Sequence, residues 1–183
     1  MKLLIVGNKS RNKHLVDLSE ELIKLKIDVK VIIDTDFIDK TLNLNFRDKL
    51  KKKNRRKELI KIFNPDLVLL DRISTIGEFF IEKKIPLFVL LRGNFWEEVK
   101  LVKEKENKTK LETVSIYRNE KLADHIFSAS TGIITISEYL KEEVKKRYPT
   151  KDVNVIYADG RKISEWMKKE EKWKWKEDKK WKK

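Results

Sequence analysis

Cysteine is absent from the chain, and histidine occurs only twice in 183 residues. The absence of cysteine excludes disulfides, thiolate zinc sites, iron–sulfur clusters and a cysteine nucleophile, and two histidines leave little material for an imidazole-based metal site. No apolar run approaches the roughly 18 to 20 residues that cross a bilayer. We therefore expect a cytoplasmic protein with no metal site, neither an integral membrane protein nor a secretory precursor.

Glycine is also scarce, with five residues in the whole chain. The first of them, Gly7, opens the sequence GNKSRNKH after an apolar run. This sequence lacks the later glycines of G-x-G-x-x-G and the terminal Gly-Lys-Ser/Thr of a P-loop. It therefore disfavours a Rossmann dehydrogenase and a nucleoside triphosphatase.

Basic residues, in contrast, are abundant: 44 lysines and arginines stand against 30 acidic residues, for a net charge of +14. Residues 168–183 hold nine lysines, four acids, no aliphatic residue and three of the tryptophans, Trp173, Trp175 and Trp181. Such a segment has no apolar stripe with which to pack as an amphipathic helix. We expect residues 1–167 to form one domain and residues 168–183 to be a disordered tail or a frayed helix.

A second basic cluster, KLKKKNRRK, spans residues 49–57. Clusters of this kind are usually solvated surface, but a positive field also attracts nucleic acid or anionic lipid. In the second case the contacts to a polyanion or a membrane would come from Lys51, Lys52, Lys53, Arg55, Arg56, Lys57, Trp173, Trp175 and Trp181.

Short apolar runs alternate with longer charged segments of helical period along residues 1–167, which is typical of a βαβ protein. A helix is predicted over about 14–26, on a seam formed by Leu15, Leu18, Leu22 and Leu25. A longer helical stretch over about 95–127 is predicted to break near Asn107. The expected fold is α/β: a single Rossmann-like domain with a mostly parallel sheet of about six strands and helices on both faces. The six expected strands are Leu3–Val6, Val29–Ile33, Leu67–Leu70, Leu87–Leu91, Ile133–Ile136 and Val153–Tyr157.

Polar residues that follow the strands are the candidate binding site, because ligands of open parallel sheets bind beyond the carboxyl ends of the strands. The expected substrate-binding residues follow the first, fourth and fifth strands: Gly7, Asn8, Lys9, Ser10, Arg11, Arg92, Gly93, Asn94, Ser137 and Glu138. The first group is either an anion site before a helix N-terminus or an ordinary polar turn. Arg92 either contacts a ligand or pairs with a neighbouring carboxylate such as Asp71. Ser137 is also positioned to cap a helix.

Catalytic candidates are few. His14 could act in acid–base chemistry, or it could cap or pack against the start of a helix, and His125 is expected to be structural. The carboxylates Asp34, Asp71 and Asp159 also follow strands. An acid–base pair of carboxylates is recognised by the distance between the two groups, which the sequence does not give. The catalytic residues therefore stay unassigned at this stage.

Two consecutive segments, GIITISEYLKEEVKKRYP and VNVIYADGRKISEW, follow Ala123-Asp124. They are similar to a strand ending in serine, a Lys/Glu-rich helix, a valine-rich strand and an Asn-Gly-Val-Asp hinge in the N-terminal domain of GT-B glycosyltransferases, of the retaining glycosyltransferase family 4 (group 1) type. In this comparison Asp159 and Gly160 would form the interdomain linker. Earlier segments resemble the first, third and fourth strands of that domain: KLLIVGNKSRNKHLVDLSEELIKLKIDVKVI, NPDLVLLDR and LFVLLRGNFWEE.

The chain departs from this family at three places. It has Gly7-Asn8 where the family usually has paired glycines, and Asp159-Gly160 where the hinge usually reads Asn-Gly. The resemblance ends at about Trp166, before the domain that binds the nucleotide-sugar donor. It therefore implies an acceptor-binding domain, truncated or completed by a separate donor-domain subunit or neighbouring gene product, and inactive as a transferase alone.

Ligands and partners follow from the same resemblance. The domain alone would bind no cofactor, a nucleotide-sugar would be the co-substrate once a donor domain is supplied, and the acceptor would be a saccharide or a lipid-linked sugar. The alternatives are a nucleic-acid-binding protein that stacks bases on its tryptophans, and a protein held at the anionic inner membrane face. Nucleic acid is the less favoured partner, because no recognised binding motif is present and the tail alone carries +5 of the charge.

Overall fold

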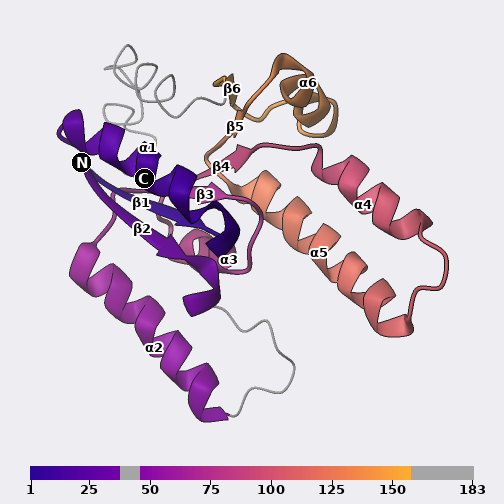
Figure 1. Cartoon of the computed structure of the whole chain (residues 1–183), viewed down its shortest axis with the longest axis horizontal. Coiled ribbons are helices and arrows are strands. Elements are labelled where there is room, and N and C mark those ends of the chain that lie inside the picture. Colours follow the sequence, from indigo (N-terminus) through magenta and orange to yellow (C-terminus); the bar gives the residue numbers. More distant parts are fainter. Residues whose placement is uncertain (38–45, 158–183) are drawn as a thin grey trace.

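Six strands form one sheet in which every neighbouring pair is parallel, in the order β2-β1-β3-β4-β5-β6 (Figure 1). The computed structural model describes residues 1–37 and 46–157. The expected linker residues Asp159 and Gly160 and the expected tail, residues 168–183, lie outside the described residues. In chain order the strands and helices are β1 (Lys2–Gly7), α1 (Asn12–Lys24), β2 (Asp28–Ile33), α2 (Phe46–Phe63), β3 (Leu67–Asp71), α3 (Ile76–Glu82), β4 (Leu87–Leu91), α4 (Phe95–Glu104), α5 (Lys110–Ala129), β5 (Gly132–Thr135), α6 (Glu138–Arg147) and β6 (Val153–Val155).

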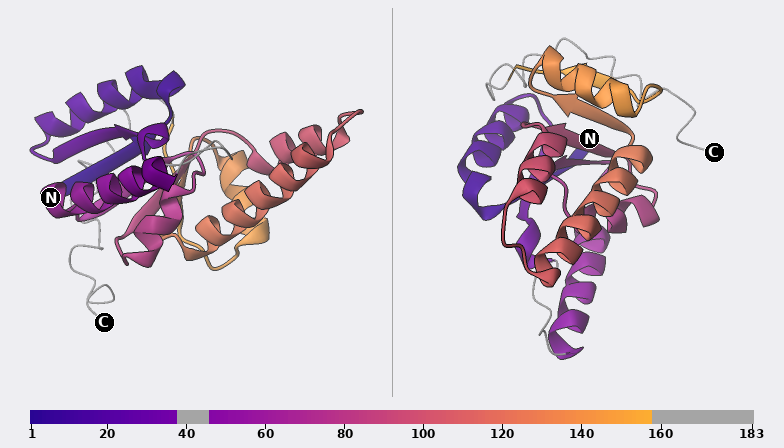
Figure 2. Two further views of the ribbon diagram at one scale, coloured as in Figure 1. Left: turned by 90° about the horizontal axis from the view of Figure 1, so that it is seen from below. Right: turned by 90° about the vertical axis from the view of Figure 1, so that its right-hand side faces the viewer.

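Helices cover both faces of the sheet, and the two faces are unequal. Parallel strands are joined by right-handed crossovers, so the direction in which the chain moves along the sheet decides the face on which each helix lies. The step from β1 to β2 places α1 on one face, and the later steps in the opposite direction place the other helices on the second face (Figure 2). This arrangement confirms the α/β class, the six-stranded parallel sheet and the helices on both faces.

The core consists of one apolar layer on each face. The layer under α1 contains the leucine seam that the sequence predicted, and Leu15, Leu18 and Leu22 are buried there against β1 and β3. The opposite layer is built from side chains of α2, α3, α5 and α6: Leu59, Ile76, Phe80, Ala123, Ile126, Phe127 and Val144. β3 and β4 are buried at every position, as central parallel strands must be when both faces are covered.

α1 occupies 12–24 rather than 14–26, and it ends at Lys24 because the chain turns at Lys26. This residue has a φ of 60°, a left-handed conformation that ends a helix. The Ile27 N–H donates to the carbonyl of Leu22, which closes the last turn and directs the chain into β2.

α4 and α5 form a helical hairpin that projects from the sheet (Figures 1 and 2). The predicted break is present at Asn107, whose φ is 63°. Thr109 and Glu112 then form a capping box at the start of α5, and the hydrogen bonds from Thr109 lower the pKa of the Glu112 carboxyl. Lys103 of α4 and Glu120 of α5 pair at 2.6 Å and hold the two helices together.

An aromatic cluster anchors the base of this hairpin. The ring of Phe127 lies 6.0 Å from Phe95, 5.4 Å from Trp96 and 5.8 Å from Tyr148, measured between centroids. The Arg147 guanidinium lies over the Trp96 ring at 4.3 Å. The cluster therefore joins α4, α5 and the end of α6.

Tyr148 gives this cluster a pH dependence. Burial, together with a 2.7 Å hydrogen bond from its hydroxyl to Asp124, raises the pKa of the Tyr148 phenol above its ordinary value. Because the folded chain holds this proton more tightly than the unfolded chain, the contribution to stability is complete below about pH 10 and is lost as the pH rises beyond it.

We expect Tyr148→Phe to reduce the fall in unfolding free energy between about pH 9 and pH 11, as measured by urea unfolding. Tyr157→Phe is the matched control, because Tyr157 is exposed on the surface. If the unfolding free energy falls equally in wild type and Tyr148→Phe, the Tyr148–Asp124 hydrogen bond does not produce the pH dependence.

Among the helices of the two described ranges, none is long and apolar enough to cross a bilayer.

Candidate functional site

A cavity of about 300 Å³ lies at the carboxyl ends of β1, β2, β3 and β4. In the sheet, β2 lies on one side of β1 and β3 lies on the other. The helices that follow β1 and β2 therefore lie on opposite faces and diverge at the carboxyl end of β1. Open α/β sheets bind ligands at such a topological switch point. The floor of the cavity is apolar, and its polar lining consists of Asn8, Asp34, Asp71, Arg72, Ser74, Arg92, Glu98 and Asn119.

The innermost polar contact joins the last residue of β3 to the residue after β4. Asp71 and Arg92 meet at 2.8 Å between Oδ1 and Nε, with the Asp71 side chain fully buried and the Arg92 side chain 18% exposed. Of the two interpretations of Arg92, the structure shows the ion pair. Among the described residues the pair occupies only Nε of Arg92, so its two Nη groups are available as donors in the cavity.

Two further polar pairs flank this one. Ser74, in the loop after β3, donates its hydroxyl to Asp34 Oδ2 at 3.2 Å, and both residues are buried. Arg72 and Glu98 approach to 3.5 Å at the mouth, where both side chains are exposed and the pair contributes little to stability. Arg72 has a φ of 94°, a conformation costly for a side chain of this size and concentrated in proteins at functional sites.

Of the two glycines of the lining, Gly7 is required by packing of the chain, whereas a side chain at Gly93 would only displace the end of the exposed Glu98 side chain. A Cβ at Gly7 would overlap Cδ1 of Leu15, so this glycine lets α1 lie close to the end of β1. A Cβ at Gly93 would lie 2.8 Å from Glu98 Oε1. Neither glycine has a positive φ.

Four of the ten predicted binding residues line the cavity: Gly7, Asn8, Arg92 and Gly93. Lys9 and Ser10 are not part of its lining. They belong to the 3-10 turn Lys9–Arg11, where the Ser10 hydroxyl donates to Asn8 Oδ1 at 2.8 Å. The side chain of Arg11 is outside the structural description.

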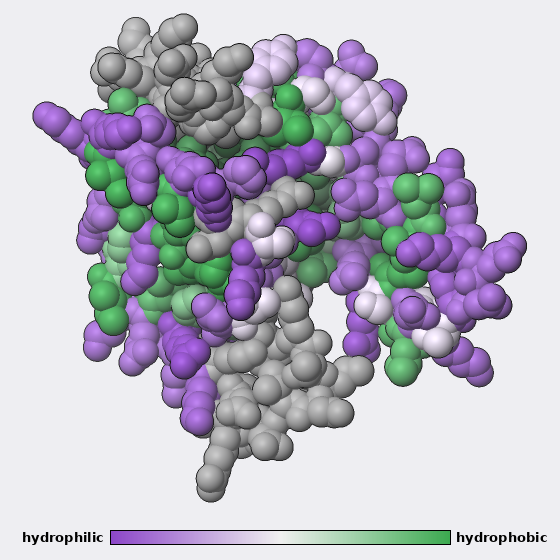
Figure 3. All heavy atoms as spheres, viewed as in Figure 1, coloured by the Kyte–Doolittle hydropathy of each residue, from purple (hydrophilic) through white to green (hydrophobic). Residues whose placement is uncertain are grey.

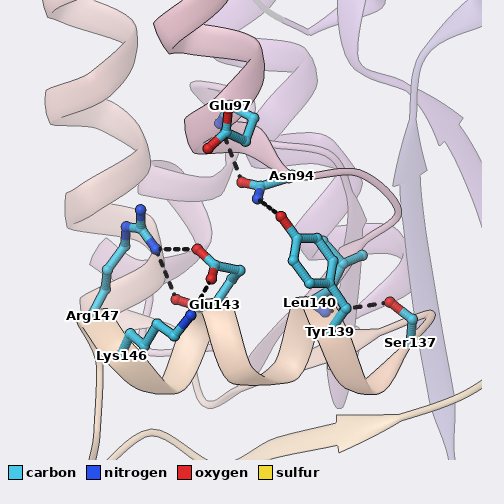
Figure 4. A network of polar contacts seen from close by, with 8 residues as sticks. All are labelled: Asn94, Glu97, Ser137, Tyr139, Leu140, Glu143, Lys146 and Arg147. Carbon is cyan, nitrogen blue, oxygen red and sulfur yellow. Dashed lines mark hydrogen bonds and ion pairs between the residues drawn. The ribbon is translucent and has the colours of Figure 1, made fainter.

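The other three predicted residues lie at the starts of α4 and α6, and Figure 4 shows two of them, Asn94 and Ser137. Asn94 accepts a hydrogen bond from the Glu97 N–H at the start of α4 and donates from Nδ2 to the Tyr139 hydroxyl at 2.8 Å. Ser137 caps α6 by accepting from the Leu140 N–H, and Glu138 pairs with Lys141 at 3.2 Å. These contacts link the start of α4 to the start of α6.

Sequence reasoning missed Ser74, Glu98 and Asn119. Glu98 lies one helical turn after Asn94, so the helix period alone could have placed it near the strand end. Asn119 lies in the middle of α5 and reaches the cavity because the hairpin turns the chain back toward the sheet, which no local pattern records.

Among the described residues, the charges that line the cavity nearly cancel. They belong to three carboxylates and two guanidiniums, and each guanidinium pairs with a carboxylate, Arg92 with Asp71 and Arg72 with Glu98. Together with two amides and a hydroxyl, this set offers donors and acceptors for a ligand rich in hydroxyl groups rather than for a polyanion. Within the described residues no group of three or more histidines and carboxylates could hold a metal ion.

Of the remaining candidates, those with described side chains lie outside the lining of this cavity. His14, at the start of α1, and His125, on α5, are both exposed. On α2, Lys51, Lys53, Arg55 and Lys57 are exposed, and the Arg56 guanidinium lies over the Phe79 ring at 5.7 Å. The side chain of Lys52 is not described, and Trp173, Trp175 and Trp181 are outside the described residues. Polyanion binding by α2 stays a prediction.

No protein-family model matches this chain, and a search of curated proteins finds no match either.

Proposed function

We propose that this chain is the acceptor-binding domain of a sugar-transfer enzyme, and that the cavity at the carboxyl ends of β1 to β4 holds the acceptor. The observation that carries the proposal is the Asp71–Arg92 pair on the apolar floor of a neutral, polar-rimmed cavity. The resemblance of the sequence to the acceptor-side domain of GT-B glycosyltransferases supports it independently.

A sugar ring presents hydroxyl groups around its edge and C–H groups on its faces. In this cavity the Nη groups of Arg92 and the amide of Asn119 would donate to ring hydroxyls, and the carboxylate of Glu98 would accept from them. The ring of Phe95, which also lines the cavity, would cover an apolar sugar face. Asp71 would act as a positioning residue, because it fixes Arg92 through Nε.

The chemical contribution of such a domain is orientation. In transfer from a nucleotide-sugar, an acceptor hydroxyl oxygen forms a bond to the anomeric carbon while the bond to the diphosphate breaks, and the hydroxyl proton passes to the departing diphosphate. Holding the acceptor in one pose lowers the entropic part of that barrier. Stabilising the departing diphosphate commonly lowers the barrier further, and this stabilisation would come from a donor-binding domain. We therefore expect no turnover of nucleotide-sugar by this chain alone. Turnover by the purified chain would contradict the dependence of transfer on a donor-binding domain.

Binding of neutral saccharides, measured by saturation-transfer NMR over a panel of mono- and disaccharides, tests the proposal. Asn119→Ala should weaken the best ligand about three- to tenfold, the effect of one lost hydrogen bond. Asn119 is exposed on α5, so the substitution leaves the core unchanged, and Asn54→Ala on the exposed face of α2 is the matched control. No saccharide bound by the wild type, or equal affinity in wild type and Asn119→Ala, would refute the proposed site.

A further inference from the structure

The outer half of the α4–α5 hairpin has apolar side chains with nothing described to cover them. α4 contains no buried residue, and the buried residues of α5 are confined to its last turns, at Ala123, Ile126 and Phe127. In the outer half, Leu101 is 62% exposed and Leu111 is 74% exposed. Val102, Val114 and Tyr117 are exposed beside them. Figure 3 shows these apolar patches among hydrophilic atoms on the projecting arm.

Lysines surround the same apolar side chains. Residues 100–117 contain five lysines and three glutamates. Lys103 pairs with Glu120, and the other four have no ion-pair partner among the described residues: Lys100, Lys105, Lys108 and Lys110. The end of the hairpin is therefore a projecting, basic and partly apolar surface.

We infer that the end of the α4–α5 hairpin, residues 100–117, docks on an anionic lipid surface. Helices that lie in a membrane interface combine apolar residues on one side with lysines that reach anionic headgroups. Leu101, Leu111 and Val114 would enter the headgroup boundary, and Tyr117 suits the same depth because its ring is apolar and its hydroxyl is polar.

A lipid surface fits this element better than a protein partner does. Stable protein interfaces bury about 800 Å² on each side and are depleted in lysine and glutamate at their centres. The end of this two-helix hairpin is a small element, and five lysines lie in the same segment as its apolar residues. A membrane accepts such a shape because lipid headgroups rearrange around it.

The hairpin also connects this surface to the cavity. Glu98 and Asn119, which line the cavity, belong to the same two helices. From Asn119 to the start of α5 at Lys110 is about 14 Å of helix, at about 1.5 Å per residue. A docked hairpin would hold the cavity within reach of a sugar carried on a lipid headgroup. This last step, a lipid-anchored acceptor, rests on the proposed function, whereas membrane docking does not.

Because the chain has no cysteine, a single introduced thiol can report on the environment of one position. The full-length Leu111→Cys variant, labelled with a polarity-sensitive fluorophore, should show a blue shift when mixed with vesicles of phosphatidylglycerol and phosphatidylcholine. It should show none with vesicles of phosphatidylcholine alone. Ile62→Cys on α2 is the matched control, since Ile62 is also 74% exposed. A missing shift at position 111, or an equal shift at position 62, would overturn the inference.

Vesicle co-sedimentation supplies a second measurement that needs no label. Leu101→Ser combined with Leu111→Ser should lower the apparent vesicle affinity about tenfold, since each leucine loses part of its favourable transfer free energy. Ile62→Ser should leave it unchanged. Equal loss in both variants would assign the binding to another surface, and undiminished binding by the double variant would exclude the hairpin. The vesicles contain no saccharide, so these results are independent of acceptor binding.

Discussion

Asp71→Ala should destabilise the protein by about 3 kcal/mol, because it leaves the Arg92 charge buried without its carboxylate. Breaking one side of a buried pair costs far more than the pair itself contributes, since the desolvated partner remains. Arg92 is 18% exposed in its side chain, so water relieves part of this cost. Urea unfolding followed by circular dichroism measures the change.

The double variant Asp71→Ala/Arg92→Met tests whether the unpaired Arg92 charge causes the loss of stability in Asp71→Ala. Replacing both charges with apolar side chains removes the uncompensated guanidinium, and the double variant should recover most of the lost unfolding free energy. Glu98→Ala is the control in the same cavity, because its pair with Arg72 is exposed and should contribute less than about 1 kcal/mol. If the double variant is no more stable than Asp71→Ala, the loss comes from other contacts of Asp71.

The same substitutions separate stability from binding. The recovered double variant would fold without the Nη donors of Arg92, so its saccharide affinity should stay low although its stability returns. A double variant that binds as tightly as the wild type would remove Arg92 from the proposed site.

The elements of the fold could be predicted from the sequence because their signals are local. Apolar runs placed all six strands, and Leu87–Leu91 matches β4 at both ends. The other strand boundaries differ by one or two residues at their ends. Val153–Tyr157 was too long, since β6 ends at Val155 and Tyr157 is exposed. Strand order could not be predicted, because the choice of neighbours depends on long-range packing.

The predicted binding residues that lie at the cavity are those that the end of a strand supplies. Gly7, Asn8, Arg92 and Gly93 follow strands directly, and they line the cavity. Asn94 and Ser137 also follow strands, but each caps the next helix instead, because a free helix N-terminus competes for the same side chains. Glu98 and Asn119 reach the site from within helices, so their role depends on how the hairpin is placed.

Placement of that hairpin depends on Phe127, and Phe127→Ala should destabilise the protein by about 4 kcal/mol. The side chain is fully buried, and its ring contacts Phe95, Trp96 and Tyr148. Removing it leaves a cavity that the three rings, two on α4 and one at the end of α6, cannot fill without moving. Tyr117→Ala, on the exposed face of the same helix, should change the unfolding free energy by less than about 0.5 kcal/mol.

Hydrogen exchange should show which elements of Phe127→Ala lose the most stability. α4 contains no buried residue, so its attachment depends on Phe95 and Trp96 at its first turn, and both rings lie against Phe127. We expect the amides of α4 to lose more protection in Phe127→Ala than those of β1 and β3, which pack under α1. Equal loss in all of these elements would mean that the hairpin and the sheet unfold as one unit. Phe95 also lines the cavity, so selective loosening of α4 should weaken saccharide binding under conditions in which the sheet stays folded.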